Sequence, residues 1–198
     1  MALIGCIATY NDIDLLPGAI KTLVDMDRVI VVDGAAGSGK TEGASTDGTV
    51  EYLTQLAADD ARVAFVPTDG PWPDKMAQRS AYLLGEAGDW YFVLEPFERA
   101  YGLSEVKLFL TSATADVFSI QQYPQPWAEQ PVMVQRLFRH LPGIRYEGTP
   151  DRVVCDAKVL VGPARPGSLL TDQDPLIAPR IVSVMHKRLR AERTSLMR

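Results

Sequence analysis

Apolar and polar positions in the first half of the chain form alternating blocks that predict strands and helices in turn. Four short apolar runs have the length and residue types of buried strands: residues 2–10, 28–33, 62–67 and 89–95. Between them, apolar residues recur at helical spacing near residues 16–24, 50–57 and 74–87. This alternation is typical of a largely parallel sheet covered by helices on its faces.

The first predicted helix has a candidate buried face and candidate capping residues. Its apolar face consists of Leu16, Ile20, Leu23 and Val24. Asn11 and Asp12 precede it, and their side-chain oxygens are of the kind that cap helices.

The second half of the chain is less regular. A helix is predicted near residues 104–112, and residues 115–123 and 131–140 are predicted as strands that pair with each other. From residue 162 to 181, Gly, Pro, Ser and Asp dominate. A connection of that length is typical of an active-site lid or a loop that receives an acceptor.

The composition is that of one ordinary globular domain. The 198 residues are 46% hydrophobic and 23% charged, and no apolar run is long enough to cross a membrane. The first residues are predicted as a strand rather than a secretion signal. Cys6 and Cys155 lie in apolar segments without metal-ligand spacing, so we expect buried, reduced thiols, which suit a cytoplasmic protein.

The net charge of -5 is unevenly distributed. The last thirteen residues carry five basic and one acidic side chain, which leaves about -9 on the residues before them. Such a tail suits a nucleic-acid arm, a membrane-surface helix, a cap over a phosphate ligand or a solvated helix. The acidic remainder argues against broad nucleic-acid binding, so nucleic-acid contact through the tail is not the favoured interpretation.

Residues that can bind a nucleotide lie at the ends of three of the predicted strands. The first strand ends in Thr9, Tyr10 and Asn11, the second in Asp33, and the fourth in Glu95. Ligands of parallel α/β sheets bind at the carboxyl ends of the strands. An aromatic ring can stack on a base, while carboxylates can bind a base, a ribose or a metal. Asp33 is the strongest candidate, because an unpaired aspartate at the end of an apolar strand is costly.

A competing motif follows the second strand. Residues 34–41, GAAGSGKT, match the phosphate-binding pattern G-x-x-x-x-G-K-[ST] and on their own predict a P-loop nucleotide triphosphatase. That motif requires a helix to begin at its Lys-Thr pair, so that backbone amides face the phosphates. Here residues 42–49, EGASTDGT, contain two glycines and no large apolar residue, so the helix is predicted to begin near 45–47. We therefore favour an irregular Gly-rich loop at residues 35–44.

An ordered series of motifs resembles the N-terminal half of family 2 glycosyltransferases. The series comprises IATYND (residues 7–12), RVIVVD (28–33), STDGT (45–49), DKMAQRSAYLLGEAGDW (74–90) and YFVLE (91–95). The segment VQRLFRHLPGIRYEG (134–148) resembles a later part of the same family. The resemblance implies a single domain, residues 1–198, with a GT-A-type three-layer α/β/α fold and a mixed, largely parallel sheet. It further implies a nucleotide-binding half at 1–100 and an acceptor-side half at 101–198 with the basic tail.

The resemblance also implies an activity: transfer of a sugar from a nucleotide-sugar donor to an acceptor, with inversion. It names no acceptor. A divalent metal, Mn²⁺ or Mg²⁺, is the usual cofactor of the family. Phe97 replaces the second acid of the Asp-x-Asp motif, which weakens that expectation. The segment Thr149-Pro150-Asp151-Arg152 stands where the family usually has His-Glu, which bears on the identity of the base.

The resemblance assigns roles to particular residues. Tyr10 would stack near the base, Asn11 would hold the turn and Asp33 would bind the nucleoside. Lys75 and Arg79, four residues apart on one helical face, would meet the nucleotide or its phosphates. Glu95 would bind the ribose or a metal, with Glu98 as a substitute metal ligand.

Two further roles fall in the second half. His186 would help to hold the metal or diphosphate, with Lys187 and Arg188 beside it. Asp151 is the candidate base. A P-loop triphosphatase and a catalytically silent glycosyltransferase-like binding protein remain alternatives.

Overall fold

The computed structural model of this chain describes residues 1–37, 41–104, 106–123, 130–148, 152–156, 159–161 and 180–183. In these ranges the strands of a large mixed sheet are β1 (Leu3–Thr9), β2 (Arg28–Asp33), β3 (Val63–Val66), β4 (Trp90–Val93), β5 (Glu98–Tyr101), β6 (Val117–Tyr123), β7 (Val132–Arg139) and β11 (Arg180–Ser183). Their order is β3-β2-β1-β4-β7-β6-β11-β5. A second, antiparallel sheet consists of β8 (Arg145–Glu147), β9 (Arg152–Val154) and β10 (Val159–Val161).

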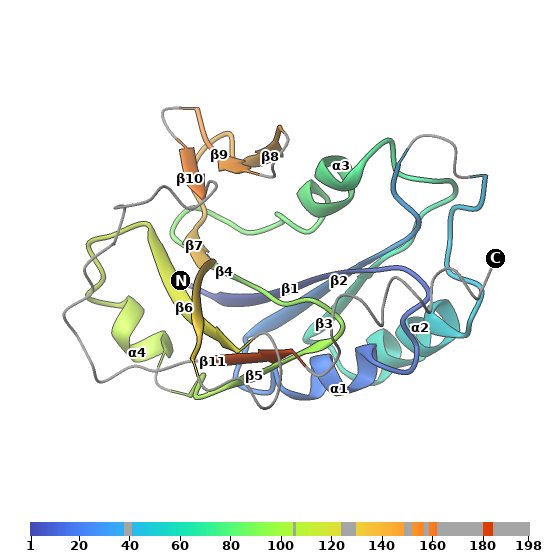
Figure 1. Ribbon diagram of the computed structural model, residues 1–198, viewed down its shortest axis with the longest axis horizontal. Coiled ribbons are helices and arrows are strands. Elements are labelled where there is room, and N and C mark those ends of the chain that lie inside the picture. The colour runs from blue at the N-terminus through green and yellow to red at the C-terminus, as the bar shows by residue number, and fades with distance from the viewer. Residues whose placement is uncertain are drawn as a thin grey trace.

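The elements form three layers, with the large sheet as the middle layer (Figure 1). The helices are α1 (Leu16–Lys21), α2 (Thr49–Asp59), α3 (Lys75–Ser80) and α4 (Val106–Leu110). Helices α1, α2 and α4 lie on one face, whereas α3 and the small sheet lie on the other. Strands β1 to β4 are mutually parallel, and β7 runs antiparallel to both β4 and β6. The predicted parallel first half and the predicted pairing of residues 115–123 with 131–140 are therefore confirmed.

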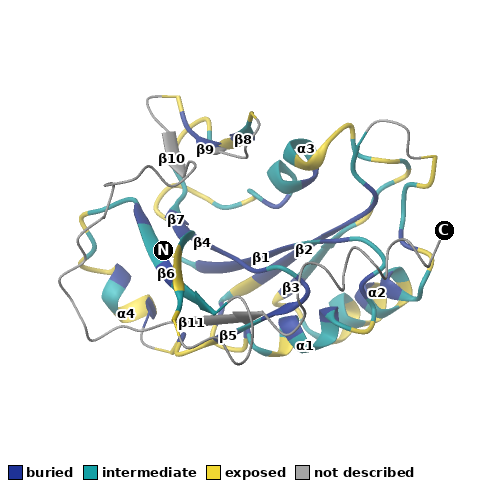
Figure 2. Cartoon of the chain, viewed as in Figure 1, coloured by how far each residue is buried: buried dark blue, intermediate teal, exposed yellow. Residues whose placement is uncertain are grey.

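The alternation of side chains along the central strands explains why both faces are covered. In β1, Leu3 and Ile7 belong to the core under α1 and α2, while Ile4 and Cys6 belong to the core under α3 and the small sheet. Every one of these side chains is almost fully buried. The buried residues accordingly concentrate along the central strands (Figure 2). A sheet buried on both faces needs apolar residues at consecutive positions, as the strand segments show.

Several predicted helix boundaries are wrong. Val24 is 64% exposed and does not share the buried face of α1, which ends at Lys21. The N-cap residue of α1, Leu15, makes no capping hydrogen bond with its side chain, and the Asp12 carboxylate accepts hydrogen bonds from the Thr9 hydroxyl and the Tyr10 amide. The helix predicted at 74–87 ends at Ser80. Just beyond it, the Gly85 amide donates to the Tyr91 hydroxyl, a contact in which a side chain at residue 85 would clash.

Helix α2 begins at Thr49, later than the predicted start at 45–47. The Asp47 carboxylate accepts hydrogen bonds from the backbone amide and the hydroxyl of Thr49, so Asp47 stands just before the helix. Gly48 has a positive φ of 95° and makes the entry turn. In residues 35–37 and 41–44 the structure has neither helix nor strand beyond one isolated bridge from Ala36, so the irregular loop is confirmed there.

The described part of this Gly-rich loop is fixed against residues 68–72. Ala35 accepts a hydrogen bond from the Trp72 amide, and the Trp72 indole donates to the Asp33 carbonyl at 2.8 Å. Gly34 has φ of 126°, and a Cβ added there would lie 2.5 Å from the Thr68 methyl and 2.9 Å from the Trp72 indole nitrogen. The close approach requires glycine at this position.

We predict that Gly34→Ala lowers the free energy of unfolding by about 1–3 kcal/mol, because alanine meets both a strained φ and a clash. Gly70→Ala is the matched control, since a Cβ there meets nothing within 4 Å, and it should change stability by less than about 0.5 kcal/mol. Urea denaturation of both variants checks this, and equal stability of the two would contradict the packing described here.

Candidate functional site

The site begins where β1 and β2 end side by side. Thr9 and Asp33 are paired in the parallel register, so the segments that follow them leave the sheet together. The Asp33 side chain is 0% exposed, and its two oxygens accept hydrogen bonds from the backbone amide and the hydroxyl of Ser45. Burial raises the pKa of the Asp33 carboxyl above its ordinary value, and the hydrogen bonds from Ser45 oppose that rise.

This geometry corrects one premise about Asp33. From the sequence we expected an unpaired Asp33, whereas the structure pairs it with Ser45. In this conformation Asp33 fixes the STDGT segment to the end of β2. Its contact with a nucleoside stays a prediction.

A set of hydrogen bonds, here called the loop clasp, joins residues 11–13 to residues 45–47. The Asn11 amide donates to the Ser45 hydroxyl, and the Thr46 amide donates to the Asn11 side-chain oxygen, both at 2.8 Å. The Ile13 amide donates to the Asp47 carboxylate at 3.0 Å. Asn11 has φ of 52°, a left-handed conformation that asparagine tolerates, so the expected turn is present. The clasp holds the loops after β1 and β2 as one unit.

Tyr10 lies on this unit, half-buried, with its hydroxyl donating to the Glu42 carboxylate at 3.2 Å. Burial and the neighbouring Glu42 raise the pKa of the Tyr10 hydroxyl. Thr9 directs its own hydroxyl inward to Asp12. The Thr9 hydroxyl thus contributes to the fold, and the stacking of a base on the Tyr10 ring stays a prediction.

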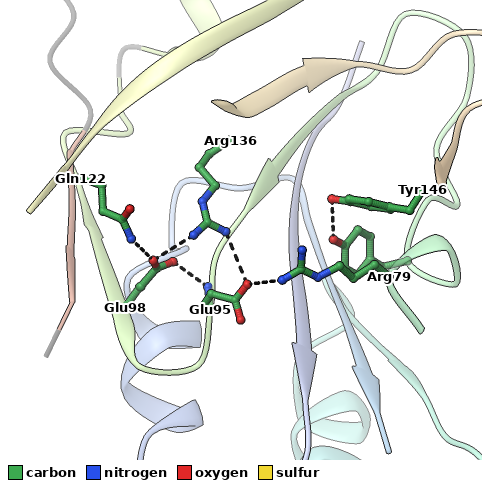
Figure 3. A network of polar contacts seen from close by, with 7 residues as sticks. Arg79, Glu95, Glu98, Gln122, Arg136 and Tyr146 are labelled. Atoms are coloured by element: carbon green, nitrogen blue, oxygen red, sulfur yellow. Dashed lines mark hydrogen bonds and ion pairs between the residues drawn. The ribbon is translucent and has the colours of Figure 1, made fainter. Parts of the chain in front are cut away.

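A chain of alternating charges lies at the end of β4, the neighbour of β1 in the sheet (Figure 3). The Arg79 guanidinium pairs with the Glu95 carboxylate at 2.6 Å. Arg136 on β7 reaches the same Glu95 oxygen at 3.5 Å and Glu98 at 3.0 Å. Arg79, Glu95 and Arg136 keep 20%, 17% and 17% of their side chains exposed, so this part of the chain of charges opens to solvent.

Glu98 is the buried end of this chain of charges. Its side chain is 0% exposed and accepts hydrogen bonds from Gln122, Arg136 and the Glu95 amide. Burial raises the pKa of Glu98, Arg136 opposes the rise, and the neighbouring Glu95 carboxylate adds to it. Glu98 therefore anchors Arg136 from the protein interior. Because it is buried, it does not face solvent as the expected substitute metal ligand would.

Arg136 was not among the residues predicted from the sequence. The register between β6 and β7 shifts here, with Ser119 opposite Gln135 and Phe118 opposite Leu137, which leaves Arg136 as the extra residue of a bulge. Bulges redirect side chains near functional sites. The one signal in the sequence was a basic residue inside an apolar strand segment, and its acidic partners are distant in the chain.

The structure brings only some of the predicted residues together. Arg79 and Glu95 form an ion pair, and Arg79 also lies over the Tyr146 ring, 5.8 Å from its centroid. The Tyr146 hydroxyl bonds that of Tyr82 within the core. Lys75 is exposed at the start of α3. Lys40, Asp151 and His186 lie outside the described residues, so their predicted roles stay predictions.

Comparisons with known proteins identify the fold. No family model matches the chain, and no curated protein matches it in sequence. It is similar to the solved structure of S. aureus TarS 1-349, with a TM-score of 0.50 and 17% identity over 62% of this chain and 36% of that one. The same TarS fragment in complex with UDP-GlcNAc gives a TM-score of 0.50 and 17% identity, over 62% of this chain and 35% of that one.

This likeness shows the fold: a mixed central sheet between helices, in one domain of GT-A type, as predicted. The chain spans about a third of the length of the TarS structures. None of the helices in the described ranges has both the length and the apolar character that a membrane crossing requires.

The loop clasp makes a prediction about Ser45. Ser45→Ala removes the hydroxyl that donates to Asp33 and accepts from Asn11, so we expect a loss of about 1–3 kcal/mol in the free energy of unfolding. The pKa of Asp33 should rise further in this variant. Because the unfolded state then releases the proton at lower pH than the folded state, stability falls as pH rises between those two pKa values.

The deficit of Ser45→Ala should therefore be larger at neutral pH than near the ordinary pKa of an aspartate. Denaturant titrations across that pH range measure it. Thr46→Ala is the control, because the Thr46 side chain is exposed and its backbone hydrogen bond to Asn11 remains. A deficit independent of pH would show that Ser45 does not stabilise the charged form of Asp33.

Proposed function

We propose that this protein transfers a sugar from a nucleotide-sugar donor to an acceptor, with the donor bound at the carboxyl ends of β1, β2 and β4. One observation carries the proposal: the loop clasp and the Arg79–Glu95 pair lie along one edge of the sheet, in the GT-A-type fold. The TarS structure in complex with UDP-GlcNAc, a nucleotide sugar, supports a donor of this class.

The described residues suit the parts of such a donor. Tyr10 offers a ring beside the base, with Asn11 and Asp33 behind it. Arg79 supplies charge for the diphosphate. Residues 1–100 would thus hold most of the donor site, and residues 101–198 would contribute Arg136 and face the acceptor.

The reaction we propose is a single displacement with inversion. An acceptor oxygen attacks the anomeric carbon, the bond from that carbon to the diphosphate oxygen breaks, and the acceptor proton passes to a base. Asp151 is the candidate base. The nucleoside diphosphate leaves with the bonding electrons, and cationic side chains stabilise its charge.

The P-loop triphosphatase alternative, based on GAAGSGKT, requires a helix that the described residues do not form at Thr41. A phosphate-binding loop places a helix N-terminus at its Lys-Thr pair. Here Thr41 and the residues up to Gly48 are not helical, and α2 begins at Thr49. A nucleotide bound to this loop would not meet the first-turn amides that the motif supplies.

Binding of nucleoside diphosphates tests the proposal. UDP, GDP or UDP-GlcNAc should raise the melting temperature, because the folded state alone binds them, while ATP should raise it less. Asp33→Asn should reduce the affinity at least tenfold. Asp60→Asn, on the surface beyond the end of α2 and paired with Arg62, is the control and should bind normally. Equal shifts with wild type and Asp33→Asn would remove Asp33 from the donor site.

Lys40→Ala separates the two nucleotide sites. If the donor lies across β1, β2 and β4, this variant should bind nucleoside diphosphate within about threefold of wild type, less than about 1 kcal/mol. ATP hydrolysis that disappears in Lys40→Ala would favour the triphosphatase instead. Sugar transfer or donor hydrolysis by the wild type, measured as released nucleoside diphosphate, distinguishes an enzyme from a silent binding protein.

A further inference from the structure

The position at which the resemblance implies a metal does not suit one. A metal site at the end of β4 needs carboxylates that are open and uncompensated. Of the two positions of the Asp-x-Asp motif, Glu95 is in contact with two guanidinium groups, and the other is Phe97, a buried apolar side chain. In the described residues, no three His, Cys, Asp or Glu side chains lie together as a metal site.

Two arginines lie where the cation would be needed. Arg79 from α3 and Arg136 from β7 meet at the same Glu95 oxygen, at 2.6 Å and 3.5 Å, and both are partly exposed. Each is fixed from behind, Arg79 by the Tyr146 ring and Arg136 by buried Glu98. Figure 3 shows the two guanidinium groups meeting at the same oxygen of Glu95, Arg136 from above and Arg79 from the right in this view.

We propose that Arg79 and Arg136 bind the donor diphosphate in place of a divalent cation, and that Glu95 positions the two arginines. This inference rests on the proposed function. Guanidinium groups stay charged at every physiological pH and bind phosphate oxygens in a fork geometry. When a phosphate group binds this pair, its oxygens take the place of the Glu95 carboxylate as partners of the two guanidinium groups. The bulge at residue 136 is the structural device that directs the second guanidinium to this point.

The sign of the Glu95 effect separates an arginine site from a metal site. If Glu95 binds a metal, Glu95→Gln must abolish metal-supported nucleotide binding. If Glu95 only positions the arginines, the amide of Glu95→Gln keeps an oxygen that can accept from both guanidinium groups and removes a negative charge that competes with phosphate. Affinity for UDP should then stay within about threefold of wild type or increase.

The experiment is calorimetry of UDP and GDP with the full chain, in EDTA and in Mn²⁺. Wild type should bind its preferred diphosphate with affinities that agree within about threefold in the two buffers. Arg79→Gln should weaken binding at least tenfold in both. Arg139→Gln is the matched control, because Arg139 lies on the same strand as Arg136 but stacks on Trp90 on the other face.

Arg136 needs a paired design, because Arg136→Gln alone leaves the buried Glu98 without its cation. The double variant Arg136→Gln/Glu98→Gln removes both charges together and should fold, yet lose at least tenfold in diphosphate affinity. Glu98→Gln alone keeps the Arg136 cation but weakens its anchor, so diphosphate affinity should fall by less than in the double variant. Melting curves of each variant separate lost folding from lost binding.

The outcomes are distinct. Binding in EDTA that depends on Arg79 and Arg136 but not on the Glu95 charge supports the inference. Binding that requires Mn²⁺ and is lost in Glu95→Gln overturns it and leaves the proposed function intact. Failure of both diphosphates to bind in either buffer overturns the proposed function and the inference with it.

Discussion

A buried carboxylate must be hydrogen-bonded or paired with a cation, and two such groups determine how the carboxyl edge of this sheet is built. Asp33, at the end of β2, is satisfied by Ser45, and this contact brings the STDGT segment against the end of β1. Glu98, the first residue of β5, is satisfied by Arg136, Gln122 and a backbone amide. Removing either set of partners would leave a charge or polar group unpaired inside the protein, at a cost of several kcal/mol for an ion pair.

These two contacts also order the groups that face solvent. The hydroxyl of Ser45 joins Asp33 to Asn11, so the loops after β1 and β2 are connected directly, and Tyr10 lies beside this connection. Glu98 holds the Arg136 guanidinium where it contacts Glu95. Glu95 in turn contacts Arg79. The exposed residues of the candidate donor site are thus arranged by the buried ones. The Gly-rich loop after Asp33 is part of this edge, because Trp72 ties its start to the end of β2.

The sequence predicted the strands better than the connections between them. Runs such as RVIVVD are buried on both faces, so their apolar character alone indicates a strand. The pairing of β6 with β7 followed from two neighbouring apolar segments. Helix ends were harder, because Ser45 looked like a cap but its hydroxyl is used by Asp33 and Asn11, contacts 12 and 34 residues away in the chain. Arg136 was not predicted because its partners, Glu95 and Glu98, are distant in the chain and only the fold brings them to it. Short β5, β8 and β9 have too few residues to show a period.

A structure determined with UDP bound tests the central claim, that the donor binds at the carboxyl edge held by these contacts. The account predicts the uracil ring beside Tyr10 and the diphosphate oxygens within hydrogen-bond distance of the Arg79 and Arg136 guanidinium groups. A diphosphate cradled instead by the backbone of residues 34–41, with the end of β4 empty, would contradict it.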